Sequence, residues 1–408
     1  MSAVLVLAGC SAGADEGDSS SITFMAAAYS DKSQAYWEDL ISRFEKEHPG
    51  EKVNLSVVSW NDYDQKVSTM LANHQQPDIL NYNTYAGYAA EDLLYPVDKV
   101  VSSSVRKDFL PAFTKDDTYK GTQYALPFIA SARAMYYNKK IFAEAGLSKP
   151  PTTWAEFEAA AEKIKEAGYT GYALPLGTEE AQGELSLWMF NGGGGWKDSA
   201  GEWAVNSPAN VQAVEFLRKL STVDKVTQSN PGTTNRTDGA WQQFAQGKVG
   251  MVMGFPGTFD SMLAKGGLKA DSDYAVAPAP VKAAGQKSAT LGVQDVLMAF
   301  KSPNDKKVEV IRDFLDYFYK ADNYQGFLTQ EKFLPTTVSG AQALRNDKVL
   351  GPYIDLLPNA RFAPTSDKSW TQVADATKQT IGLAVQPGHS PAQVLGDIQK
   401  RAEEAANR

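Results

Sequence analysis

The stretch YALPFIASARAMYYN, Tyr124–Asn138, decides the fold that the sequence predicts. It indicates two short β segments, Tyr124–Ile129 and Arg133–Tyr137, joined by a break at Ala130–Ser131. One unit of alternating strands and helices precedes this stretch, and a second such unit follows it. A short β crossing between two units has what a hinge needs, namely few residues, no helix and small side chains at the pivot. The alternative is an ordinary pair of core strands.

Length and composition narrow the class of protein. The chain has 408 residues, which is too long for one hydrophobic core, so two lobes are expected. Hydrophobic residues make up 43% and aromatic residues 11%, enough for sizeable cores and an aromatic-lined site. The net charge of −8 argues against nucleic acid as a partner, because phosphate binding needs a basic surface. No run of about 18 apolar residues occurs, so no membrane-spanning helix is predicted.

Cysteine and histidine are scarce. Cys10 is the only cysteine, which excludes a disulfide within the chain and a zinc site made of several thiolates. His48, His74 and His389 are far apart in the sequence, and we interpret all three as surface residues. The sequence therefore predicts neither a metal site nor a cofactor.

Strands alternate with helices from residue 22 onward, which predicts an α/β fold with a mostly parallel sheet. The segments Ile22–Tyr29 and Val53–Val58 read as its first two strands, and Pro77–Leu80 leads into a third short strand that ends in Asn81–Tyr85. In such sheets ligands bind beyond the carboxyl ends of the strands. Polar and aromatic residues occupy those ends here: Tyr29, Ser30 and Asp31, then Trp60 and Asn61, then Asn83 and Thr84.

Several phrases, in this order along the chain, resemble those of a known family. They are FEKEHPG (residues 44–50), the W-x-D-Y-x-x-K pattern (60–66), PDI (77–79), MYYNKKIFAEAG (135–146), the P-x-T-W-x-E-F pattern (151–157), FAQGKVGMVMGFPG (244–257) and FLPTT (333–337). Together they resemble the extracellular solute-binding proteins of ABC importers, specifically the large carbohydrate-binding branch that is similar to maltose-binding protein. The resemblance covers essentially the whole chain from about residue 22.

This resemblance implies a two-lobed periplasmic-binding-protein fold with a cleft between the lobes and three crossings of the chain. We expect the crossings near Ile129–Arg133, Val276–Pro280 and Leu334–Thr336. The expected domains are a lipoprotein signal remnant and disordered linker (1–21), an N-lobe (22–130 plus 279–334) and a C-lobe (131–278 plus 335–408).

The amino-terminal segment Leu7–Cys10 resembles the lipobox of bacterial lipoprotein signal peptides. In that family the cysteine carries lipid chains, and two or more chains give stable membrane anchoring. The resemblance implies that Cys10 is lipidated and that the protein is held on the outer face of the bacterial cell membrane. No Lys or Arg precedes Lys32, although such signal peptides begin with a positively charged segment. We therefore expect that Met1 is a late start or that the true amino terminus is missing.

Sugars present flat C–H faces and rings of hydroxyl groups, which proteins hold with aromatic faces and planar polar side chains. The candidate stacking residues are Trp60, Trp188, Phe255 and Trp370, of which Trp188 is alternatively a core residue. The candidate polar contacts are Tyr29, Ser30, Asn61, Asn83, Thr84, Glu180, Gln182, Gln294, Asp295 and Arg361. Glu179 is the alternative to Glu180, and structural hydrogen bonds are the alternative role for the polar pair at 294–295.

The sequence thus predicts capture of a carbohydrate, a di- or oligosaccharide, by a monomer that delivers it to an ABC permease. A secreted glycan-active enzyme is one alternative, although no Ser-His-Asp, HExxH or Gly-x-Ser-x-Gly pattern occurs. A polyol is a second alternative ligand. A ferric ion is a third, suggested by the adjacent Tyr136 and Tyr137, although neighbouring residues of a strand point to opposite faces.

Overall fold

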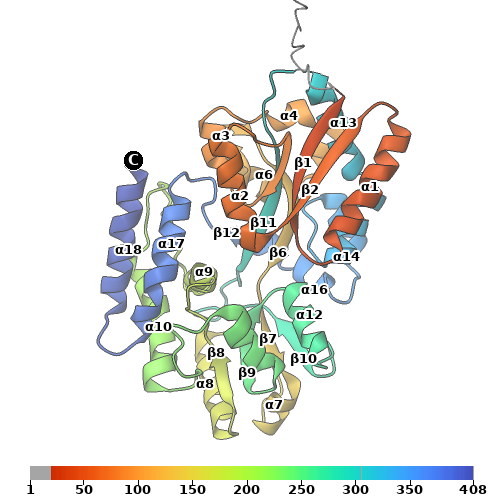
Figure 1. Cartoon of the computed structure of the whole chain (residues 1–408). Coiled ribbons are helices and arrows are strands. Elements are labelled where there is room, and N and C mark those ends of the chain that lie inside the picture. The colour runs from red at the N-terminus through yellow and green to blue at the C-terminus, as the bar shows by residue number, and fades with distance from the viewer. Residues whose placement is uncertain (1–19, 305, 408) are drawn as a thin grey trace, which may run out of the picture.

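The computed structural model describes residues 20–304 and 306–407. Cys10 and the predicted lipobox lie outside the described residues. Two lobes, each built on its own β-sheet, lie one above the other in Figure 1. The predicted two-lobed α/β fold is therefore confirmed. No helix within the described ranges is long and apolar enough to cross a membrane.

The upper lobe of Figure 1 holds a six-stranded sheet in the order β12-β11-β3-β1-β2, with β6 also paired to β11. β2 and β3 run parallel to β1, whereas β11 runs antiparallel to β3 and β6. The strands are β1 (Ser21–Ala28), β2 (Lys52–Ser59), β3 (Ile79–Tyr82), β6 (Leu126–Ala132), β11 (Thr290–Ala299) and β12 (Ala360–Phe362). The longer helices of this lobe are α1 (Ser33–Glu47), α2 (Trp60–Ala72), α13 (Lys306–Phe318) and α14 (Ala321–Glu331).

Hydrophobic periodicity explains how these helices pack. In α1 the apolar side chains recur every three or four residues, so Trp37, Leu40 and Phe44 are all buried on one face. Trp37 meets Phe24 of β1 edge to face, with ring centroids 4.8 Å apart. Each such buried side chain contributes roughly 1.5–3 kcal/mol of transfer free energy, and together they fix α1 against the sheet.

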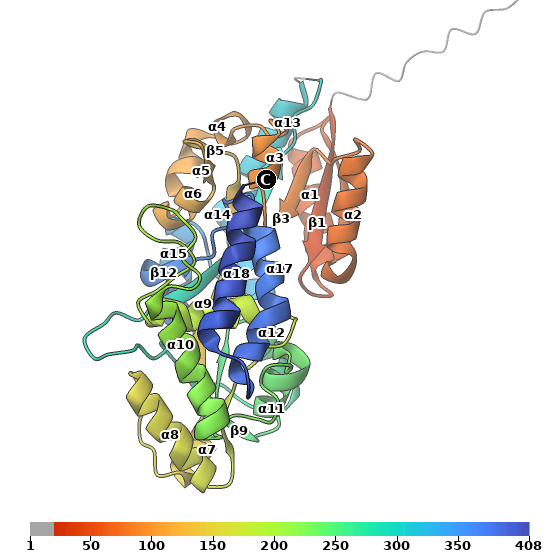
Figure 2. The same ribbon diagram turned by 90° about the vertical axis from the view of Figure 1, so that its left-hand side faces the viewer.

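The lower lobe holds a four-stranded sheet in the order β10-β7-β9-β8. Its strands are β7 (Ala134–Asn138), β8 (Thr170–Ala173), β9 (Val249–Gly254) and β10 (Tyr274–Ala277). Its helices are α7 (Lys139–Glu144), α8 (Trp154–Glu166), α9 (Ala181–Asn191), α10 (Pro208–Arg218), α11 (Gln242–Ala245), α12 (Thr258–Lys265), α17 (Trp370–Thr380) and α18 (Pro391–Ala406). Figure 2 shows α17 and α18 side by side along one flank of this lobe, where they pack on α9 and α10.

Short elements complete the fold. They are α3 (Ala86–Ala90), α4 (Val97–Val100), α5 (Ser103–Asp108), α6 (Pro111–Asp116), α15 (Val338–Leu344), α16 (Gly351–Ile354), the hairpin β4 (Thr118–Tyr119) and β5 (Thr122–Gln123), π-helical turns at Lys219–Val223 and Arg236–Trp241, and 3-10 turns at Leu357–Asn359 and Ile381–Val385.

The first crossing between the lobes lies within the stretch Tyr124–Asn138. β6 belongs to the upper sheet and β7 to the lower sheet, and Arg133 alone separates them. The break was expected at Ala130–Ser131, but both residues continue β6 because they pair with β11. The link between the two sheets is therefore one buried arginine rather than a pair of small residues.

The return crossing is at Ala289–Leu291, not at Val276–Pro280 as expected from the sequence. β10 pairs with β7 of the lower sheet, and Val281 hydrogen-bonds Thr152 in the same lobe. After the exposed loop that projects in Figure 2, the chain returns upward beside Arg133. There Thr290 Oγ1 donates to the Arg133 carbonyl at 2.8 Å.

We place the third crossing after β12. Leu334 and Ala130 exchange backbone hydrogen bonds of 2.8 and 2.9 Å, so the expected crossing at Leu334–Thr336 lies beside β6 of the upper lobe. β12 still pairs with β11, and the lower-lobe helix α17 begins at Trp370. We propose that the lobes divide at Arg133, at Ala289–Leu291 and at residues 363–369.

Candidate functional site

A cavity of about 330 Å³ lies between the lobes, where α9 approaches β11. The upper lobe contributes the end of β3, Asp116, β11 and the segment after β12, and the lower lobe contributes α9 and α17. A second hollow, of about 380 Å³, is lined mainly by apolar side chains of α6, α15 and α16. Because the first cavity joins the sheet of the upper lobe to α9 and α17 of the lower lobe and has polar walls, it is the candidate site.

Two adjacent carboxylates mark the upper end of the cavity. Asp116 lines the cavity, and Asp117 is fully buried. Gln294, on β11, donates from Nε2 to Asp117 Oδ1 at 2.7 Å and to Asp116 Oδ2 at 3.3 Å. Thr365 also donates to Asp116 Oδ2, at 2.9 Å. These donors fix the orientation of the acid pair.

Burial dominates the electrostatics of this pair. It raises the pKa of Asp116 to about 6, against hydrogen bonds from Thr365 and Gln294 that lower it. Burial, and after it repulsion by Asp116, holds the pKa of Asp117 well above its usual range. Gln294 Oε1 and Asp117 Oδ2 are buried and have no hydrogen-bond partner among the described residues.

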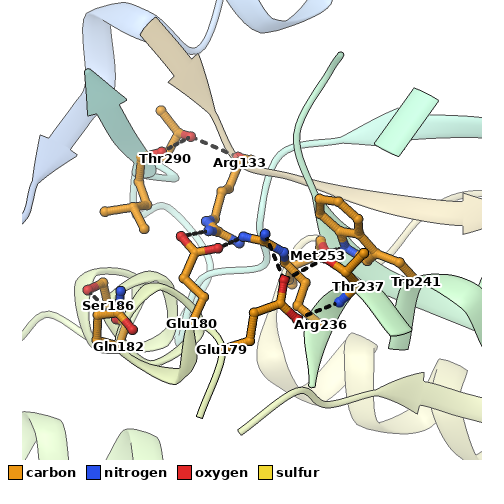
Figure 3. A network of polar contacts seen from close by, with 11 residues as sticks. Arg133, Glu179, Glu180, Gln182, Ser186, Arg236, Thr237, Trp241, Met253 and Thr290 are labelled. Carbon is orange, nitrogen blue, oxygen red and sulfur yellow. Dashed lines mark hydrogen bonds and ion pairs between the residues drawn. The ribbon is translucent and has the colours of Figure 1, made fainter. Parts of the chain in front are cut away.

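A second cluster of polar side chains, a network of ion pairs and hydrogen bonds, lies beside the first crossing on the side of the lower lobe (Figure 3). Glu180 pairs with Arg133 through one carboxylate oxygen and with Arg236 through the other. Glu179 accepts from Arg236 Nη2 at 3.0 Å and from the Thr237 backbone N–H at 2.8 Å. Burial, and then repulsion by Arg133, lowers the pKa of Arg236 to about 10. The acids at this end of the cavity are thus matched by arginines.

Aromatic side chains line the cavity from three elements. Trp370, at the start of α17, is 7% exposed and packs against Trp196 with centroids 4.9 Å apart. Phe362 lines the cavity from β12 and Tyr82 from β3. Tyr82 stacks on Trp60 at 6.4 Å and 17°.

The structure brings together part of the predicted site. The predicted residues that line the cavity are Asn83, Thr84, Glu180, Gln182, Gln294 and Trp370.

Other predicted residues from the upper lobe lie outside the lining. The Tyr29 hydroxyl donates to Asp295 Oδ2 at 2.6 Å, so Asp295 makes the structural hydrogen bond that the sequence left open. Ser30 is exposed, and Trp60 stacks on Tyr82 without lining the cavity itself. The side chain of Asn61 is outside the part of the chain that the structure describes.

Three predicted residues are placed away from the lining by their own packing. Trp188 is 1% exposed and donates from Nε1 to Glu184 at 2.8 Å, which makes it the core residue of the alternative interpretation. Phe255 lies beneath the Arg133 and Arg236 guanidinium groups, with carbon-to-centroid distances of 5.2 and 5.1 Å. Arg361 is exposed and donates to the Gly194 carbonyl at 2.8 Å.

The adjacent tyrosines of β7 point to different surroundings. The Tyr136 hydroxyl donates to Asp260 Oδ1 at 3.1 Å, whereas Tyr137 packs on Phe142 with centroids 4.9 Å apart. Tyr136 and Tyr137 therefore do not face a common point, as the geometry of a strand requires.

Sequence reasoning missed the acid pair and the arginines. Asp116 and Asp117 stand together just before the hairpin β4–β5, and adjacent acids close to the predicted hinge were the available signal. Arg133 is the only charged residue between Tyr124 and Asn138, which was a second available signal. Arg236 lies in a polar loop and offered none.

Comparison with known proteins gives a consistent picture. The profile of the bacterial extracellular solute-binding protein family matches residues 27–325. A protein of Brucella abortus (strain 2308), named as a binding protein without a stated ligand, is 30% identical over 397 residues, covering 96% of this chain and 94% of its own. The diacetylchitobiose binding protein DasA of Streptomyces coelicolor is 26% identical over 418 residues, covering 96% and 92%.

A solved structure supports the fold. The cyclic alpha-maltosyl-1,6-maltose binding protein of Arthrobacter globiformis superposes with a TM-score of 0.81 at 20% identity, covering 95% of this chain and 99% of that protein. At this identity the likeness shows a shared fold.

Proposed function

The chain belongs to the bacterial extracellular solute-binding protein family, and from this premise we propose that it captures a carbohydrate between its lobes and delivers it to an ABC permease. The proposal covers a di- or oligosaccharide ligand, a monomeric state and binding without catalysis. It also covers a lipid anchor at Cys10, which would hold the protein outside the cytoplasm on the cell membrane.

The observation that carries the proposal is the make-up of the cavity. Its polar wall offers the amide groups of Asn83, Gln182 and Gln294 and the carboxylate of Glu180. Its apolar wall offers the indole of Trp370. Planar polar groups suit the hydroxyl groups of a sugar ring, and an aromatic face suits its C–H face. The names of DasA and of the Arthrobacter protein, which both bind saccharides, support the same ligand class.

Binding would also couple to movement of the lobes. The polar wall joins Asn83 and Gln294 of the upper lobe to Gln182 of the lower lobe. A ligand that contacts both lobes favours the closed form, because only that form makes both sets of contacts. The closed form would then be the one that docks on the permease.

A ligand screen tests the proposal. Thermal unfolding should be followed with mono-, di- and oligosaccharides, polyols, amino acids and ferric ion. A ligand at about 100 times its Kd stabilises by about 2.7 kcal/mol, a visible rise in melting temperature. Trp370→Ala should lose that rise and Trp370→Phe should keep part of it, provided that both variants melt cooperatively without ligand. A response to ferric ion or amino acids alone, with none to sugars, would contradict a carbohydrate ligand.

The anchor has its own test. Wild-type protein and Cys10→Ser should be expressed with their natural upstream sequence in a bacterial host and fractionated. Membrane retention of the wild type and release of the variant is the expected outcome, and equal release of both would contradict lipidation at Cys10.

A further inference from the structure

The two ends of the cavity differ in how their carboxylates are compensated. At the lower end, Glu180 has Arg133 and Arg236 as partners. At the upper end, neither Asp116 nor Asp117 forms an ion pair with a Lys or Arg among the described residues. Burying a carboxylate without a cation is costly, so the upper end has an unmet demand for positive charge.

The same end also has an unmet demand for a hydrogen-bond donor. Gln294 is 8% exposed, lines the cavity, and uses its Nε2 on the acid pair. Its Oε1 is buried and has no donor among the described residues. A buried carbonyl oxygen without a donor costs free energy that a ligand can recover. The unpartnered Oε1 of Gln294 is thus a second observation, besides the two acids, that points to a ligand.

One chemical group meets both demands. A hydroxyl group of a neutral sugar brings one donor and no charge, whereas a protonated amino group brings three donors and a positive charge. It can donate to Gln294 Oε1 and to Asp116 together, and hydrogen bonds to charged groups are the stronger kind. A carboxylate or phosphate brought to the same place would be repelled by Asp116.

We propose that the Asp116–Gln294 end of the cavity is a subsite for a protonated amino group, so that the ligand is an amino sugar. This inference rests on the proposed function and narrows its substrate class. Asp116 supplies the charge, Gln294 the second acceptor, and Thr365 holds the Asp116 carboxylate in place.

Calorimetric titrations of matched sugars test the inference. The probes are glucosamine and its β-1,4-linked dimer, their N-acetylated counterparts, glucose, cellobiose, and glucuronate, all at pH 7.5 and low salt. We expect an amino sugar to bind about tenfold more tightly than its neutral counterparts, the ratio for one hydrogen bond to a charged group. Glucuronate should bind most weakly.

Two variants test whether the preference for an amino sugar arises at Asp116. Asp116→Asn keeps the side-chain shape and should remove the tenfold preference for the amine, so that amino and neutral sugars bind this variant about equally. Asp98→Asn, an exposed acid in α4 of the same lobe, removes the same charge away from the cavity and should keep the preference. Unliganded melting curves of both variants verify that they fold.

The outcomes separate the inference from the proposed function. Equal affinity for amino and neutral sugars, or an amine preference that Asp116→Asn retains, overturns the amino subsite and leaves carbohydrate capture standing. Equal affinities for amino and neutral sugars would mean that a bound proton, rather than the ligand's amino group, compensates the charge of Asp116 and Asp117. Failure of every sugar to bind contradicts the proposed function as well.

Discussion

Arg133 combines two roles that normally conflict, because it is a charged side chain and also the only residue between two strands of different sheets. It is 2% exposed, and its guanidinium lies over the Phe255 ring and against Glu180. Removing one partner of a buried ion pair typically costs about 3–5 kcal/mol, because the other charge remains buried. We predict a loss of this size in the free energy of unfolding for Arg133→Met, measured by urea denaturation.

Two further variants show whether that loss comes from charge. Arg133→Met combined with Glu180→Gln should recover part of it, because the uncompensated carboxylate is gone. Arg345→Met removes the partner of Asp355 in a pair whose side chains are 69% and 63% exposed, so its cost should stay below about 1 kcal/mol. Equal losses in Arg133→Met and Arg345→Met would contradict the role given to the buried network.

Asp295 should make stability depend on pH. Burial raises its pKa to about 6, against the hydrogen bond from Tyr29, so the folded state holds its proton more tightly than the unfolded state. A raised pKa means that stability falls as pH rises from about 4 to about 6, by up to about 3 kcal/mol for this group.

Asp295→Asn removes the loss of stability that ionisation of the buried carboxyl group causes. We predict that the variant gains stability relative to the wild type between pH 4.5 and pH 7.5, by about 1–3 kcal/mol in urea denaturation. Its amide oxygen can still accept from Tyr29, so that hydrogen bond need not be lost. A difference between the two proteins that is the same at both pH values would show that Asp295 is ionised as easily when folded as when unfolded.

At the residue scale, the sequence indicated which kinds of side chain would line the cavity better than it indicated which side chains would be buried. Asn83, Gln182 and Trp370 were recognisable because their chemistry and position agree with the cavity. Asp116 and Asp117 were missed because acids are common in the chain, and only the fold distinguishes a buried pair from a solvated one. The core position of Trp188 was undecided for the same reason.

At the scale of elements, two glycines set how closely α8 approaches its sheet. A Cβ atom at Gly171 of β8 would lie 2.6 Å from the Ala161 carbonyl oxygen, and one at Gly250 of β9 would lie 2.6 Å from Ile164 Cδ1. The backbone contact at Gly171 cannot be relieved by rotating a side chain. We predict that Gly171→Ala destabilises the protein by about 1–3 kcal/mol, the usual range for overpacking.

A glycine in open surroundings provides the matched control. At Gly396, within α18, a Cβ atom would have nothing within 4 Å among the described residues. Gly396→Ala should raise the free energy of unfolding by about 0.5–1 kcal/mol, because alanine is the better helix former. Losses of similar size in both variants, measured in the same urea titration, would contradict the close packing at Gly171.

Elements defined by local pattern were predictable, and those defined by pairing were not. Thr153 caps α8 through a local signal, because its hydroxyl accepts from the Glu156 backbone N–H three residues on. The segment Val276–Pro280 was expected to cross between the lobes, but Val276 and Ala277 belong to β10, which pairs with β7 of the lower sheet. The sheet that a strand joins depends on residues far away in the chain, and no local pattern encodes it.

At the scale of the whole molecule, hydrogen bonds connect the proposed crossings to one another and to the wall of the cavity. Arg133 and Thr290 hydrogen-bond each other at two adjacent crossings, and Thr365 of the third crossing donates to Asp116 at the cavity wall. Residues that would contact the ligand are therefore bonded to residues about which the lobes would turn. Ligand binding and lobe position should be coupled for this reason.

Small-angle X-ray scattering measures that coupling directly. We predict that the radius of gyration decreases when the protein is saturated with a sugar that raises its melting temperature, because the ligand stabilises only the form in which both lobes contact it. Trp370→Ala at the same sugar concentration, and the wild type with a sugar that does not bind, should show no decrease. A tight-binding sugar that leaves the radius of gyration unchanged would mean that both lobes are already in their final positions. The cavity between α9 and β11 would then be a rigid site, and Arg133 a structural link without a hinge function.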